Sequence, residues 1–244
     1  MSWLLVLTPL LPLLGLLPGG RFLLPLVAPL TLYPDFVGRV RRRDYLGAWS
    51  RGLVWALLLS AGVIALVHFL PGAAGEAIWN GEPYRKEMFG WIATGAAPEN
   101  DWRQFLPVHL EHLALFLLLT WVSGGYLGLS LGAALVGYMS YFVGCFALAS
   151  GHPVTGAVVA WVPWSVLRVV AFVLLGAVFS RPLLIRRPWP FTRREVRLMG
   201  LAAAGLVADV LIKATLAPTY GLWLRHMAQA AAATLYSGAF RPLT

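Results

Sequence analysis

The sequence predicts an all-α membrane protein, a polytopic transmembrane helical bundle of about six spans. Of its residues 59% are hydrophobic, and the mean hydropathy is +0.73. Only 12% are charged, about half the share in a soluble domain. The stretch Phe105–Ser180 has just two charged residues, Glu111 and Arg168. Backbone amides in lipid must be bonded within their own segment, so the spans are expected to be helices.

The apolar stretch is too long for one crossing, which takes about 20 residues. Glycine and proline mark turns at Ser123–Gly125 and Ser150–Pro153. The stretch is therefore predicted to fold into three successive spans. These are Pro107–Val122, Tyr126–Ala149 and Val154–Ser180.

The first part of the chain, Met1–Tyr33, is apolar but is interrupted by Pro9, Pro12, Pro18, Pro25 and Pro29. It has no basic leading region, so we do not expect a signal peptide. Three arrangements fit this pattern. The stretch forms one kinked span, a re-entrant hairpin or a segment lying in the membrane interface.

Two basic segments, Arg39–Arg51 and Arg181–Arg197, hold 11 of the 19 lysines and arginines. The positive-inside rule places both in the cytoplasm. Leu53–Leu70 is then the first clear span and leaves the cytoplasm. The following segment, Pro71–Leu106, is expected to be a polar outer loop whose aromatic residues anchor at the lipid headgroups.

Beyond the second basic segment, Leu198–Leu216 is predicted to cross outward. Tyr220–Ala239 is predicted to be a sixth crossing, with an amphipathic helix on the outer surface as the alternative. We treat residues 1–244 as a single membrane domain. The expected location is the plasma (inner) membrane of a prokaryote, with segments 39–51 and 181–197 cytoplasmic.

The net charge of +9 does not indicate nucleic-acid binding here, because most of the basic residues lie beside predicted spans. The expected partners are the lipid bilayer and other membrane proteins. A polybasic role in binding lipid headgroups is a further alternative.

A series of glycines runs through the central stretch, and its first members are four residues apart. Small residues at this spacing let another helix approach closely in lipid. Packing within the bundle and a dimer interface both fit. The series consists of Gly124, Gly128, Gly132, Gly137 and Gly144.

Three charged residues fall inside predicted spans: Arg168, Asp209 and Lys213. Arg168 and Asp209 lie at similar depth in adjacent antiparallel spans, so we expect their side chains to meet. Lys213 follows Asp209 by one helical turn on the same face. A structural ion pair and a path for protons or ions are both consistent with charges at this depth.

The five histidines all fall at the outer end of this topology. His109 and His112 share a helix face with Glu111 between them in sequence. Imidazole and carboxylate suit zinc, copper or haem iron, so a metal or haem site is one hypothesis, with interfacial histidines bonded to loop backbone as the other. The metal or haem hypothesis requires His109 or His112 to lie near another outer histidine. The remaining histidines are His68, His152 and His226.

Familiar catalytic signatures are absent, including GxSxG, a Walker loop and paired metal-binding cysteines. The protein is therefore not expected to be an enzyme.

The region from Leu53 to Leu184 resembles the stage II sporulation protein M family of integral membrane proteins. The likeness rests on a polar-headed helix from His112 into the turn at Ser123–Gly125, and on the helix bearing Gly137 and Gly144. It also rests on the proline-bearing Val162-Pro163-Trp164. The family has Asn in place of His112, and a following Glu where this chain has Arg168. The resemblance implies a non-enzymatic membrane protein.

Three functions follow from these patterns. The leading hypothesis is a non-enzymatic protein that acts by helix packing with partner membrane proteins. The second is a small ion- or proton-coupled transporter that uses Arg168, Asp209 and Lys213. The third is a metal- or haem-binding redox protein that uses the outer histidines.

Overall fold

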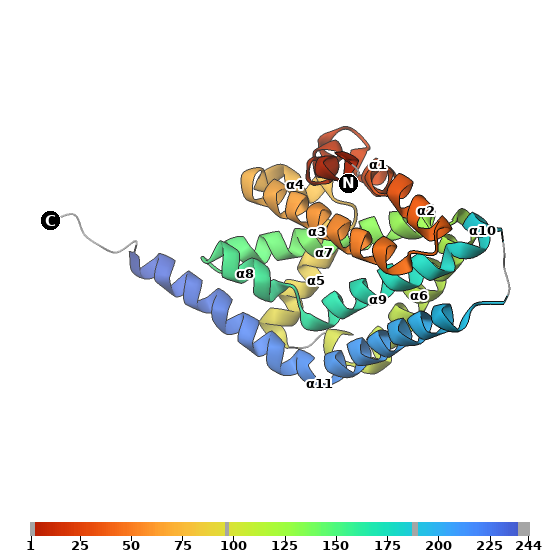
Figure 1. Cartoon of the computed structure of the whole chain (residues 1–244). Coiled ribbons are helices and arrows are strands. Elements are labelled where there is room, and N and C mark those ends of the chain that lie inside the picture. The colour runs from red at the N-terminus through yellow and green to blue at the C-terminus, as the bar shows by residue number, and fades with distance from the viewer. Residues whose placement is uncertain (1–2, 96–97, 187–189, 239–244) are drawn as a thin grey trace.

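A computed structural model describes residues 3–95, 98–186 and 190–238, with side chains described up to residue 229. Every regular element in these ranges is a helix, which confirms the all-α prediction (Figure 1). Five of the described helical segments are long and apolar enough to cross a membrane. They are α3 (Tyr45–Phe69), α6 (Trp102–Ser123), α7 (Tyr126–Ala149), Pro163–Ile185 and Arg193–Gln229.

Helix α7 is the centre of the bundle and contacts α3, α5, α6, α8 and α1. Its bounds are those predicted from the flanking turn residues. In the apolar 18-residue stretch of α7, 67% of the residues are buried, whereas in that of α6 only 17% are. Small residues permit this packing: a Cβ atom on Gly144 would lie 2.8 Å from Cβ of Val67 in α3.

Two polar caps start their helices earlier than hydropathy predicts. Asp44 accepts a hydrogen bond from the amide of Gly47 at 3.0 Å, so α3 begins at Tyr45 instead of Leu53. Asp101 accepts one from the amide of Arg103 at 2.9 Å, so α6 begins at Trp102 instead of Pro107. Such caps satisfy amides that have no partner within the helix.

The N-terminal stretch is a helical hairpin packed on α3 (Figure 1). A 3-10 helix, η1 (Trp3–Leu16), leads into α1 (Gly20–Val27), η2 (Ala28–Thr31) and α2 (Tyr33–Arg41). Prolines lack the amide donor that an α-helix needs, which accounts for the short and 3-10 elements here. The chain turns back between η1 and α1, so residues 3–33 do not form one continuous kinked span.

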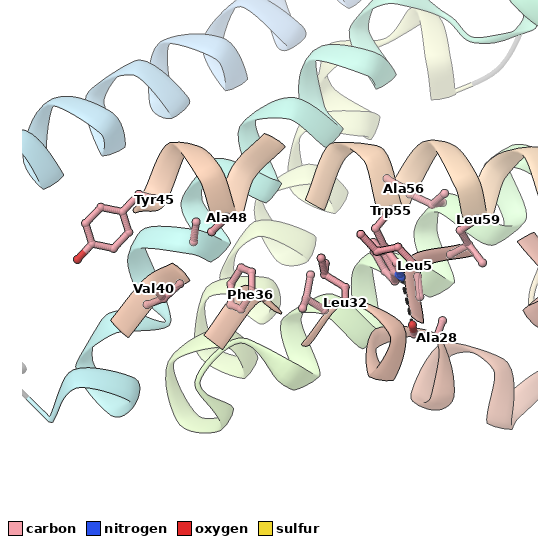
Figure 2. Packing of buried hydrophobic residues seen from close by; sticks show 14 of the residues in the cluster. Leu5, Ala28, Leu32, Phe36, Val40, Tyr45, Ala48, Trp55, Ala56 and Leu59 are labelled. Carbon is pink, nitrogen blue, oxygen red and sulfur yellow. Dashed lines mark hydrogen bonds between the residues drawn. The ribbon is translucent and has the colours of Figure 1, made fainter. Parts of the chain in front are cut away.

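Hydrogen bonds and apolar contacts fasten this hairpin. The Trp55 indole donates to the carbonyl of Ala28 at 3.1 Å, and the hydroxyls of Thr8 and Thr31 lie 2.9 Å apart. Figure 2 shows the apolar side chains of the hairpin and α2 against those of α3, with Phe36 no more than 1% exposed.

The outer segment is not a simple surface loop, which corrects the prediction. It forms α4 (Pro71–Ala77) and α5 (Gly81–Thr94), and α5 packs against α7 and α11. Met88, Trp91 and Ile92 are at most 3% exposed. Their i, i+3, i+4 spacing forms one apolar face, so Trp91 is a core residue and not a headgroup anchor.

The predicted span Val154–Ser180 is broken into α8 (Pro153–Ala160) and α9 (Pro163–Phe179). Val162 is extended, with φ −59° and ψ 137°. A residue before proline avoids the helical region for steric reasons, so Pro163 forces a new helix to start. The short α10 (Arg181–Ile185) continues α9.

The described residues do not have the predicted break before Tyr220, so residues 220–238 are not a separate sixth crossing. The alternative, an amphipathic helix on the outer surface, stays a prediction. Helix α11 runs without a break from Arg193 to Gly238 and contains Pro218. Figure 1 shows it bent near its middle. Proline bends a helix by removing one hydrogen bond, but it does not reverse the chain. Ala239 lies outside the described residues.

The two basic segments lie at the same end of the bundle. The hydroxyl of Tyr45 donates to the carboxylate of Glu195, and the Arg181 guanidinium lies 3.2 Å from the same carboxylate. Residues 187–189 of the second segment are outside the described residues. That this end faces the cytoplasm stays a prediction.

Labelling of single cysteines tests the topology. In a Cys145→Ser background, cysteine at Glu76 in α4 and cysteine at Arg186 should react with a membrane-impermeant maleimide from opposite sides of oriented vesicles. Both parent side chains are exposed at opposite ends of the bundle. Reaction of both positions from one side would contradict the arrangement.

Candidate functional site

A buried ion pair joins α9 to α11. Two parallel hydrogen bonds run from Arg168 to Asp209, Nε to Oδ2 at 2.8 Å and Nη2 to Oδ1 at 3.0 Å. The side chain of Asp209 is only 2% exposed and that of Arg168 19%. The contact predicted from matched depths is confirmed. A bidentate arrangement of this kind is the strongest geometry for a guanidinium and a carboxylate.

The two helices are in ordinary van der Waals contact at this level. A Cβ on Gly205 of α11 would lie 3.5 Å from the Cβ of Ala171 in α9. Arg168 lies roughly 18 Å along the helix from Ser180, at 1.5 Å per residue. That is near the middle of a hydrocarbon layer about 30 Å thick, where an unpaired charge is costly.

A second ion pair lies one helical turn further out on α11. The Lys213 ammonium is 2.8 Å from a Glu99 carboxylate oxygen, and Lys213 is 2% exposed. Glu99 belongs to η3 (Pro98–Asn100). The same ammonium lies 4.3 Å from the ring centroid of Phe105, a cation–π contact. Charges thus alternate in sign along the cluster, in the order Arg168, Asp209, Lys213 and Glu99.

Helix α5 covers the outer side of this cluster. Its Tyr84 ring lies 4.6 Å from the ring of Tyr138 in α7. Burial, with the nearby Glu99 carboxylate, holds the pKa of Tyr84 well above its ordinary value. Partial burial and repulsion by Glu99 raise the pKa of the Glu87 carboxyl. Glu87 therefore takes up a proton more readily than a free glutamate.

On the inner side, Arg168 lines a cavity of about 60 Å³ between α3, α6, α7 and α9. Its walls are mainly apolar and include Phe116 and Phe172. This volume has room for a few water molecules. The hydroxyl of Thr120 faces no hydrogen-bond partner within the described residues. The polar groups of the lining are those of His112, Thr120, Tyr138, Ser165 and Arg168.

The histidines do not form a metal centre. Over the residues whose side chains are described, no three of His, Cys, Asp and Glu gather as metal ligands. His109 bonds through Nδ1 to the carbonyl of Phe105 at 2.8 Å, and His112 lines the cavity. The other histidines have exposed side chains, as does Glu111. These are His68, His152 and His226.

The glycine series serves several purposes within the chain. Gly124 ends α6 with φ 62°, and Gly128 packs against Thr120 of α6. Gly132 faces open space at the cavity, while Gly137 and Gly144 face Ile78 and Val67. These contacts favour packing within the bundle for Gly128 and Gly144.

Two members of buried ion pairs were not identified from the sequence. Glu99 lies in an irregular segment, and no periodic pattern links it to Lys213. For Glu195 the sequence does contain an indication, because Thr192-x-x-Glu195 has the pattern of a capping box at the start of a helix. The amide of Thr192 donates to Glu195 at 2.7 Å and the amide of Glu195 to the Thr192 hydroxyl at 3.3 Å. The same glutamate neutralises Arg181, which is 3% exposed.

No known family model matches this chain, and the searches of curated proteins and of solved structures found no significant match. The resemblance to the stage II sporulation protein M family therefore stays a prediction.

Replacing one member of the central pair should destabilise the protein. Asp209→Asn leaves the buried Arg168 unpaired, which costs about 3–5 kcal/mol in comparable soluble cases. Thermal unfolding in detergent should show a lower midpoint, and adding Arg168→Gln should restore part of the loss. Additive losses in the double variant would contradict a coupled pair.

Two glycines of α7 should differ in their tolerance of a methyl group. A Cβ on Gly128 would overlap the Thr120 hydroxyl, whereas a Cβ on Gly132 meets no atom within 4 Å. Gly128→Ala should cost about 1–3 kcal/mol of stability by overpacking. Gly132→Ala is the matched control and should unfold near the wild-type temperature. Equal midpoints for the two variants would contradict the close α6–α7 contact.

Proposed function

We propose that the protein is a small proton- or ion-coupled transport protein of the membrane, with the Arg168–Asp209 pair as its switch. The observation that carries this proposal is the position of the pair, near mid-depth and beside a cavity with polar groups. Apolar residues of similar volume would join the two helices at no greater cost. Ionisable groups at this depth are typical of ion and substrate pathways.

The switch follows from electrostatics. While Asp209 is ionised, its carboxylate holds the guanidinium of Arg168. An ion that binds the Asp209 carboxylate in place of the guanidinium removes that attraction. The side chain of Arg168 then turns toward the cavity that it already lines, where Ser165 and His112 offer polar groups.

Polar groups continue from the pair in both directions. Toward the outer end lie Lys213, Glu99 and then Glu87, whose raised pKa favours proton uptake. Toward the inner end the mainly apolar cavity extends to Gly125 and Gly176. Proton movement on that side would pass through water molecules in the cavity, which has room for a few.

The proposed topology has six crossings in the plasma (inner) membrane of a prokaryote, with the basic end cytoplasmic. The sixth crossing is the broken helix of residues 20–41, in place of the one predicted near the C-terminus. At 1.5 Å per residue it is roughly 33 Å long, enough for the hydrocarbon layer. Its inner end carries Arg39 and Arg41.

The second candidate function is packing with partner membrane proteins, which is compatible with the non-enzymatic membrane protein that the sporulation-family resemblance implies. A specific observation favours it. In the apolar 18-residue stretches of α6 and α11, only 17% of the residues are buried within the chain. Large apolar side chains on these helices, such as Leu118 and Leu211, are more than half exposed.

Proton flux into liposomes tests the transport proposal. The purified protein is reconstituted with an internal pH dye, and a potassium diffusion potential is applied. We expect flux above that of protein-free vesicles from the wild type. The Arg168→Gln, Asp209→Asn double variant should fall to the protein-free rate, because it keeps the helix contact without the charges.

The matched control is the Glu82→Gln, Arg85→Gln variant. It removes another ion pair, whose side chains are 36% and 35% exposed, and should keep its flux. Undiminished flux in the Arg168 and Asp209 double variant would assign the central pair a purely structural role. Wild-type flux no greater than that of empty vesicles would contradict proton transport.

A further inference from the structure

An apolar groove lies on the surface of the inner half of the bundle, between α6 and the α10–α11 region. It consists of two hollows of about 610 and 410 Å³ that share Trp121 and Pro182. Leu117 and Leu118 form one wall, and Val196 and Met199 form the other. The second hollow lies beside the second basic segment, since Leu183 and Arg186 line it.

One arginine, Arg186, lines the second hollow. A second, Arg193, begins α11 three residues before Val196, which lines the first hollow. Residues three apart share a helix face, so we expect Arg193 to lie on the side of α11 that faces the groove. Both arginine side chains are exposed, and neither has an ion-pair partner among the described residues.

The lining indicates the kind of occupant. In a bilayer such a groove is filled either by a helix or by a lipid chain. Close helix contacts in lipid need small residues, but the walls carry Leu, Trp, Phe, Val and Met side chains. A flexible acyl chain adapts to such a surface. The free guanidinium groups at the mouth match a phosphate, which arginine binds with two parallel hydrogen bonds.

We propose that this groove is a binding site for one anionic phospholipid. An acyl chain lies between Leu118 and the Val196–Met199 face, and the phosphate group is held by Arg186 and Arg193. Trp121, which is 52% exposed, lies beside the headgroup level, where tryptophan is common. This inference does not depend on the proposed transport function.

Lipid titration followed by native mass spectrometry tests the site. The detergent-purified protein is titrated with phosphatidylglycerol and, separately, with phosphatidylcholine of the same chains. The wild type should bind one phosphatidylglycerol about tenfold more tightly than phosphatidylcholine, a difference of about 1.4 kcal/mol. Arg186→Gln with Arg193→Gln should abolish that preference.

The matched control is Arg41→Gln with Arg42→Gln, which removes the same charge at exposed positions of the other basic segment. It should keep the preference. A second variant, Met199→Trp, keeps every charge but fills the groove, and should weaken binding of both lipids. Circular dichroism and the unfolding midpoint report whether each variant is folded.

Three results would overturn the proposal. If both arginine double variants lost the preference for phosphatidylglycerol equally, the lipid would be attracted by the diffuse surface charge and not by this site. Equal binding of the two lipids by the wild type would mean an apolar groove without headgroup selection. A folded Met199→Trp protein with wild-type binding would place the lipid elsewhere.

Discussion

A charged group buried among apolar helices must find a partner within the protein, because its apolar surroundings offer none. The Arg168–Asp209 pair meets this constraint between α9 and α11, with Asp209 almost fully buried. It fixes the register of α9 against α11, since both hydrogen bonds need the two helices at one axial position. The close contact of Gly205 with Ala171 depends on that same register.

The rest of α11 is held by further polar contacts at other levels. At the end that carries the basic segments, Glu195 accepts a hydrogen bond from the hydroxyl of Tyr45 and pairs with Arg181. Further out, the Tyr220 hydroxyl donates to the carbonyl of Val159 at 2.7 Å. Beyond it, Arg225 donates to the carbonyl of Ile92 at 2.6 Å. Helix α11 thus connects elements from nearly the whole chain.

The sequence predicts local features of this fold better than distant ones. Glycine and serine turns set the ends of α7, and residue counting was enough to match the depths of Arg168 and Asp209. The partner of Lys213 was not predictable, because Glu99 lies in an irregular segment that reaches α11 only through tertiary packing. The burial of α5 was also missed, since Met88, Trp91 and Ile92 stand among charged residues that suggest a surface loop. The sequence suggested a break before Tyr220, but α11 continues through Pro218.

The continuity of α11 has a mechanical consequence. At 1.5 Å per residue its 46 residues extend over roughly 69 Å, more than twice the hydrocarbon thickness. The helix is bent near its middle, and its sequence there contains Pro218 (Figure 1). Glu195 and Asp209 both lie before Pro218, so a tilt of that part of α11 moves the two residues together. Arg225 lies beyond Pro218, so a movement of the last part of α11 reaches the Arg168–Asp209 pair only as far as the bend transmits it.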